Sequence, residues 1–199
     1  MRNHSGYAFA ILCFFMLTMA ADARPTPTIE GLALGMTADE AEMVLRAQHI
    51  ASRVTPRPCL SDYLAMQRST VPPAGPGRCT QSMFAQTEAG SLLVFFNEAL
   101  PDRPGVSVVT TIAVNSASDT MMADVAKQAG APTLTDGPVL IWCFDYACKS
   151  GDDWDEPYAG RQLLEHQGSG LTLADPRAER LYEQSLGEQL KAHGVTIRA

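Results

Sequence analysis

Apolar residues recur at helical spacing directly after a helix-start signal near the beginning of the chain. Ala41 and Leu45 lie on one face of a predicted helix over residues 38–48. Thr37 and Glu40 have the spacing of a capping box, in which the hydroxyl accepts from the Glu40 amide and the carboxylate accepts from the Thr37 amide. The sequence therefore predicts that the first helix begins after Thr37.

The same periodicity predicts two further helices. The second begins near Ser118 or Asp119 and ends where Gly130 and Pro132 follow, the usual order of residues after a helix. Its predicted inner face consists of Met122, Val125, Ala126 and Ala129. The last helix follows Asp175-Pro176, with Asp as the cap and Pro in the first turn, and runs to residues 193–194.

Short runs rich in β-branched and aromatic residues predict strands. Residues 92–96 and 106–114 are expected to form an antiparallel pair, and residues 139–144 a third strong strand. Residues 161–166 and 171–174 form a predicted hairpin around Gly-Ser-Gly at 168–170. The large apolar residues of these strands are expected in the core: Phe95, Phe96, Trp142 and Phe144.

Residues 51–90 interrupt these patterns with five prolines and several glycines, which disfavour long regular elements. We expect only a short strand there, near residues 83–86. The overall order, a helix and strands at 38–114 and again at 119–174, indicates a weak tandem repeat whose halves share one sheet. The predicted fold is α+β, with helices packed on one face of an antiparallel sheet and two disulfides.

The N-terminus has the three parts of a secretory signal peptide. Arg2 precedes an apolar run at residues 7–19, and Ala21-Asp22-Ala23 offers small residues for cleavage. The rival interpretation is a transmembrane anchor. A membrane-spanning helix needs about 20 apolar residues, and the run at residues 7–19 is shorter than that. We therefore expect residues 1–23 to be cleaved, leaving one α+β domain at 24–199 with weak halves at 29–114 and 115–199, located in the periplasm or secreted and without a membrane span.

Cleavage would remove Cys13 and leave four of the five cysteines, an even number that indicates two disulfides in an exported chain. Three pairings are possible, and we favour the two local ones, Cys59–Cys79 and Cys143–Cys148. A metal site is the rival interpretation, but the chain has no CxxC and no histidine at ligand spacing from a cysteine.

Composition and charge exclude several functions. The 199 residues carry a formal net charge of -7, which argues against a nucleic-acid partner. The chain has no GxSxG, Walker A or GxGxxG motif, so no cofactor is expected. His49, His166 and His193 are better explained as structural or solvated than as general acids or bases.

The most distinctive feature is an acidic loop at residues 145–160 that contains aromatic residues. Its candidate binding residues are Trp154, Asp152, Asp153, Asp155, Glu156, Tyr146 and Tyr158. The loop fits a solvated segment pinned by Cys143–Cys148, a Ca²⁺ site of non-EF-hand spacing, or a recognition loop for a basic protein or a sugar-bearing ligand. The sequence does not decide whether it binds Ca²⁺.

The stretch GLALGMTADEA at residues 31–41 resembles the opening of small exported bacterial proteins, among them the outer-membrane assembly lipoproteins of the SmpA/OmlA type. Ala129-Gly130-Ala131-Pro132 is similar to the end of their second helix. That family implies two helices on an antiparallel sheet. The chain is also similar in plan to the β-lactamase inhibitory proteins, which implies tandem helix–sheet units and two disulfides. The chain lacks the lipidated cysteine of the lipoproteins, and the resemblance implies no functional residue in this sequence.

Three functional hypotheses follow. The first is an exported, non-enzymatic binding or accessory protein of the bacterial envelope, with a protein or envelope component as partner. Its working surface would be the acidic loop or the exposed face of the sheet. The second is a secreted inhibitor or partner-binding module. The third is an envelope enzyme that uses a carboxylate and His166.

Overall fold

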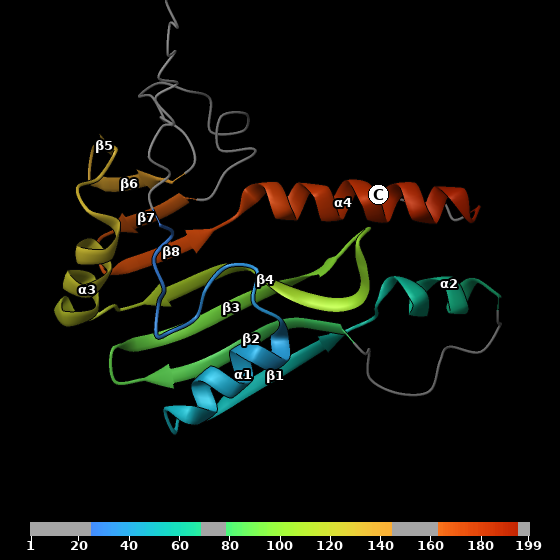
Figure 1. The fold of residues 1–199 in the computed structure, drawn as a ribbon, viewed down its shortest axis with the longest axis horizontal. Coiled ribbons are helices and arrows are strands. Elements are labelled where there is room, and N and C mark those ends of the chain that lie inside the picture. Colours follow the sequence, from blue (N-terminus) through green and yellow to red (C-terminus); the bar gives the residue numbers. More distant parts are fainter. Residues whose placement is uncertain (1–24, 69–78, 145–162, 195–199) are drawn as a thin grey trace, which may run out of the picture.

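The computed structural model describes residues 25–68, 79–144 and 163–194. Within these ranges, eight strands form one antiparallel sheet in the order β1-β2-β3-β4-β8-β7-β6-β5 (Figure 1). The strands are β1 Ser52–Arg57, β2 Cys79–Thr87, β3 Gly90–Ala99, β4 Arg103–Asn115, β5 Leu134–Asp136, β6 Val139–Cys143, β7 Leu163–Gln167 and β8 Gly170–Ala174. The helices are α1 Ala38–Ala47, α2 Leu60–Arg68, α3 Asp119–Ala129 and α4 Pro176–Ala192.

The sheet is built from two similar halves. In each half a helix, α1 or α3, precedes four strands whose first member lies at an outer edge of the sheet and whose last member lies at its centre. The halves meet where β4 pairs with β8, from Thr111 opposite Ala174 to Val114 opposite Leu171. The prediction that both halves share one antiparallel sheet is confirmed. Two helices depart from the repeat, because α2 is inserted between β1 and β2 and α4 follows β8.

The main core lies between the sheet and the two repeated helices. The register places Met83, Val94, Ile112, Leu173, Leu164 and Trp142 in one row across six strands, and all six side chains are buried. Ala41 and Leu45 of α1 and Val125 of α3 pack in the same cluster. The predicted capping box of α1 is present, with the Thr37 amide 2.8 Å from the Glu40 carboxylate and the Glu40 amide 3.2 Å from the Thr37 hydroxyl.

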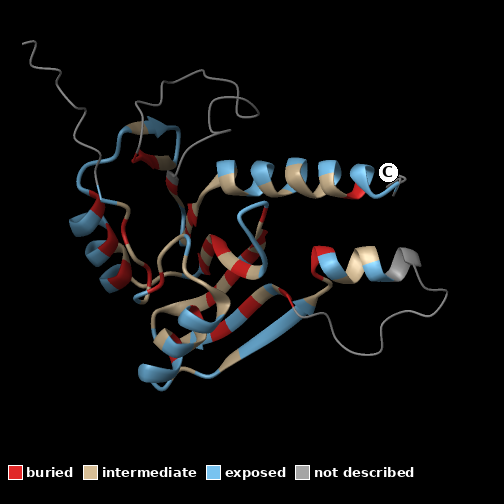
Figure 2. Cartoon of the chain, turned by 45° about the vertical axis from the view of Figure 1, so that its right-hand side comes forward, coloured by how far each residue is buried: buried red, intermediate tan, exposed pale blue. Residues whose placement is uncertain are grey.

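The helices α2 and α4 form a second, smaller cluster at the other end of the molecule (Figures 1 and 2). Its buried members are Leu60, Leu100 and Leu190. The Arg57 guanidinium lies over the Tyr182 ring, 4.5 Å from its centroid, and so links β1 to α4. The predicted packing of helices against the sheet therefore describes α1 and α3, whereas α2 and α4 pack mainly around the end of the long β3–β4 hairpin.

The expectation that residues 51–90 hold only one short strand was wrong. Before β3 this region contains β1, α2 and the long strand β2. Pro56 is tolerated because β1 is an edge strand and its register shifts between Thr55 and Pro56. The sheet and the Cys59–Cys79 bond supply the order that local propensity lacks.

The assignment of Phe95 to the core was also wrong. Phe96 is 1% exposed but Phe95 is 41% exposed, because successive side chains of a strand point to opposite faces. Trp142 and Phe144 are buried as expected. On α3 the buried methionine is Met121, whereas Met122, the one predicted, is only partly buried.

The predicted Cys59–Cys79 disulfide is confirmed. Cys143 is also disulfide-bonded, and its expected partner, Cys148, lies outside the described ranges. The predicted signal peptide, residues 1–23, lies outside them as well. Among the helices that the structure describes, none is both long enough and apolar enough to cross a membrane.

Candidate functional site

The acidic loop predicted as a recognition or Ca²⁺-binding surface falls outside the described ranges, which stop at residue 144 and resume at residue 163. This concerns every binding residue proposed from the sequence, namely Tyr146, Asp152, Asp153, Trp154, Asp155, Glu156 and Tyr158. The binding role of these residues therefore stays a prediction. The other surface expected from the sequence, the exposed face of the sheet, is described in the structure.

That surface, here called the open face, is the side of β1–β4 opposite the main core. The register assigns to it Arg53, Thr55, Ser82, Phe84, Gln86, Ser91, Leu93, Phe95, Thr111, Ala113 and Asn115. Most of these residues are small or polar, as expected for strands that are buried on one side only. Phe84 and Phe95 do not fit that pattern.

Phe84 and Phe95 are 45% and 41% exposed at the middle of β2 and β3. Phe84 lies opposite Leu93, and Phe95 lies two residues further along the same strand. This diagonal position is within reach of aromatic side chains, so the three residues form one apolar patch. Of the exposed large apolar side chains in the described part of the chain, these two phenylalanines are the ones on the open face.

The surroundings of this patch are polar. Arg53 lies opposite Phe84 on the edge strand, and Ser82 and Thr111 flank Phe95 on its two neighbouring strands. An apolar aromatic centre with a polar rim is the usual composition of a protein-binding surface. The sequence contains a signal for the position of Leu93 and Phe95. Because side chains alternate along a strand, burial of Leu92, Val94 and Phe96 on the core side places Leu93 and Phe95 on the opposite face.

The same side of the sheet is buried further along, at β5 and β6. Ile141 is 0% exposed and clusters with Cys143, Leu134 and Val139. Between the two regions lies Glu165 of β7, which pairs with Thr172 and Ile141. Burial raises the pKa of the Glu165 carboxyl above 4.5. The exposed apolar surface is therefore a feature of β2 and β3.

His166, the base of the enzyme hypothesis, lies on the covered side of the sheet. It pairs with Leu140 and Leu171, and its Nδ1 atom is buried without a hydrogen-bond partner. Within the described ranges no hydrogen bond or ion pair joins His166 to a carboxylate. Among the described residues, therefore, no carboxylate orients His166 for acid–base chemistry.

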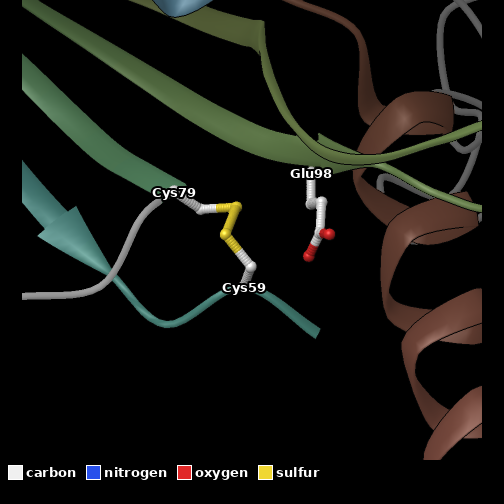
Figure 3. Close-up of side chains that lie close together, drawn as sticks. All are labelled: Cys59, Cys79 and Glu98. Carbon is white, nitrogen blue, oxygen red and sulfur yellow. A yellow bond between two sulfur atoms is a disulfide. The ribbon is translucent and has the colours of Figure 1, made fainter. Parts of the chain in front are cut away.

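A buried carboxylate, Glu98, lies beside the Cys59–Cys79 disulfide (Figure 3). One carboxylate oxygen of Glu98 and the Sγ atoms of Cys59 and Cys79 lie within 4.8 Å of one another. The cysteines are bonded to each other, and the carboxylate accepts from the Leu60 amide at 2.8 Å and the Gly105 amide at 2.6 Å. The disulfide and the Glu98 carboxylate therefore fix the start of α2 against the β3–β4 hairpin, and we interpret the cluster as structural.

Comparisons with protein-family models, with curated proteins and with solved structures found no match for this chain.

Proposed function

We propose that this chain is an exported, non-enzymatic protein that binds another protein through the open face of its sheet. The observation that carries the proposal is the pair Phe84 and Phe95, each more than 40% exposed at the centre of a polar surface. Large aromatic side chains that are exposed in the free protein lose the most solvent contact in a complex. They are therefore common among the residues that dominate binding energy.

Two further observations support the proposal. The Cys59–Cys79 disulfide is the kind of bond that persists in an oxidising compartment, which agrees with the signal-peptide pattern at residues 1–23. The open face also extends over long paired strands, β2–β4, that are fixed by the main core behind them. A rigid surface loses little conformational entropy on binding.

The test replaces Phe84 and Phe95 by threonine, which keeps a high β propensity while removing the aromatic surface. The tagged chain is expressed in its own host, and proteins that co-purify with it are quantified by mass spectrometry. We expect a partner that is enriched by the unmodified chain and lost with the Phe84→Thr/Phe95→Thr variant.

The matched control is Met43→Gln/Leu181→Gln. Met43 on α1 and Leu181 on α4 are exposed to 58% and 46%, so the control removes comparable apolar surface from other parts of the molecule. The proposal requires that the control variant still captures the partner. If both variants lost the partner equally, capture would be due to nonspecific hydrophobic association and not to the open face.

A further inference from the structure

Three side chains that are able to bind a metal converge where α2 begins (Figure 3). Cys59 precedes α2, Cys79 is the first residue of β2, and Glu98 lies near the end of β3. Each of them is at most 3% exposed. Among the described residues, no other three cysteine, histidine or acidic side chains bring their ligand atoms within 4.8 Å of one another. In the oxidised chain the two sulfur atoms are bonded to each other, so the cluster is structural.

Reduction of the disulfide changes what this cluster can bind. A dithiol protein transfers two electrons and two protons to the Cys59–Cys79 bond. That bond breaks, two thiols form in this chain, and the reductant becomes a disulfide. When a Zn²⁺ ion then binds, the two thiols release their two protons and become thiolate ligands. The Glu98 carboxylate is the third ligand.

Two thiolates and one carboxylate are a ligand set that suits Zn²⁺. Zinc binds sulfur at about 2.3 Å and carboxylate oxygen at about 2.0–2.2 Å, almost always with four ligands at tetrahedral angles. The three ligand atoms already lie within 4.8 Å of one another, so small movements of the side chains bring them around one ion. A water molecule would be the fourth ligand.

Backbone hydrogen bonds already orient the Glu98 carboxylate. The Leu60 amide donates to Oε2 at 2.8 Å, and the Gly105 amide donates to Oε1 at 2.6 Å. An ionised carboxylate has about four lone-pair sites, so either oxygen can bind a metal ion and keep its amide donor. Hydrogen bonds of this kind hold a metal ligand in position and raise metal affinity.

A second observation, the environment of Arg57, also favours an anionic metal site here. Two thiolates, one carboxylate and Zn²⁺ together carry one net negative charge. Arg57 lies opposite Cys79 in the β1–β2 register, and its Nε and Nη2 atoms are buried without a hydrogen-bond partner. Burial raises the pKa of Tyr182, Arg57 lowers it and Glu98 raises it, so both charged groups lie near this ring. A buried guanidinium without a partner is costly, and the anionic site supplies the opposite charge.

We infer that the reduced chain binds Zn²⁺ through Cys59, Cys79 and Glu98, hereafter the α2 zinc site. The zinc ion replaces the disulfide as the link between the start of α2 and β2. Because metal binding to a folded site stabilises the fold, Zn²⁺ should restore stability that reduction removes. The α2 zinc site does not depend on the proposed function, since none of its residues belongs to the open face.

The test uses Co²⁺, which occupies tetrahedral zinc sites and has absorption bands that report thiolate ligands. The purified chain is reduced with a phosphine without oxygen, freed of the phosphine, and titrated with Co²⁺ and then with Zn²⁺. We expect a thiolate-to-cobalt charge-transfer band in the reduced chain, its loss when Zn²⁺ is added, and no such band in the oxidised chain. The thermal unfolding midpoint of the reduced chain should rise with Zn²⁺, and that of the oxidised chain should not.

Variants separate the α2 zinc site from the other cysteines and from acidic residues in general. Glu98→Gln should bind Co²⁺ about tenfold or more weakly, whereas Glu88→Gln, at an exposed residue, should bind as the unmodified chain does. Cys143→Ser/Cys148→Ser should keep the band, and Cys59→Ser should lose at least half of its intensity. If Glu98→Gln does not fold, these cysteine variants decide.

Three results would each overturn the inference. The first is a reduced chain without the charge-transfer band. The second is a band that is lost with Cys143→Ser/Cys148→Ser and kept with Cys59→Ser. The third is equal Co²⁺ affinity of the Glu98→Gln and Glu88→Gln variants, which would assign binding to thiols alone.

Discussion

Glu98 is the buried carboxylate that anchors the start of α2 to the β3–β4 hairpin, and its removal gives a graded test of this account. The carboxylate accepts two backbone hydrogen bonds, from Leu60 and from Gly105. Leu60 is buried, so its amide would lose its partner where water cannot easily replace it. Gly105 is exposed, so its amide can be rehydrated.

These environments set the size of the effect. A buried amide that loses a charged acceptor costs about 2 kcal/mol, and an exposed one about 1 kcal/mol, so Glu98→Ala should lower the free energy of unfolding by about 3 kcal/mol. Glu98→Gln keeps one acceptor oxygen but places an amide nitrogen where the second stood. It should therefore lose roughly half as much, about 1–2 kcal/mol.

The assay is urea unfolding of the oxidised protein, followed by circular dichroism. Glu88→Ala, a substitution of an exposed glutamate, is the control and should stay within about 0.5 kcal/mol of the unmodified chain. If both Glu98 variants were as stable as this control, Glu98 would not anchor α2, and our explanation of the cluster in Figure 3 would be refuted.

Three further predictions concern stability. Replacing both Cys59 and Cys79 by serine opens a loop with a sequence separation of 20 and should cost about 3 kcal/mol in urea unfolding; an unchanged midpoint would contradict it. Burial raises the pKa of Glu165 above 4.5, so the ionised carboxylate destabilises the folded state. As the pH rises above 4.5, the Glu165→Gln variant should therefore become increasingly more stable than the unmodified chain. Below pH 4.5 the stabilities of the variant and the unmodified chain should converge. A constant difference at all pH values would exclude this cause. Trp142→Phe removes the 2.8 Å hydrogen bond to the Gly130 carbonyl and should cost about 1–2 kcal/mol by thermal unfolding, whereas no loss would mean that this bond contributes nothing.

Elements with strong local signals were predictable from the sequence. The capping box at Thr37 and Glu40 marked the start of α1, and Asp175 with Pro176 marked the start of α4. The hairpin of β7 and β8 followed from its Gly-Ser-Gly turn. In each case a few adjacent residues determine the backbone geometry, so no tertiary contact is needed to recognise the element.

Elements that depend on tertiary contacts were not predictable. The edge strand β1 contains Pro56 and is ordered by its pairing with β2, and α2 begins beside the Cys59–Cys79 bond and the distant Glu98. The short strand β5 exists as the partner of β6.

The open face was predictable only in outline. An exposed sheet face is expected from the sequence, but the hydrophobicity of Phe95 by itself predicts a core position, whereas its side chain is 41% exposed. Phe84 carried no signal of its own, since its exposure depends on the register of β2 against β3.

Binding of a partner protein by the open face can be detected by site-specific photo-cross-linking in the host cell. A photo-reactive phenylalanine analogue is placed at residue 84 or 95, and at residue 43 or 181 as controls with comparable exposure. We predict that positions 84 and 95 yield an adduct with the same protein and that positions 43 and 181 do not. Adducts of equal yield at all four positions, or none at 84 and 95, would contradict the account.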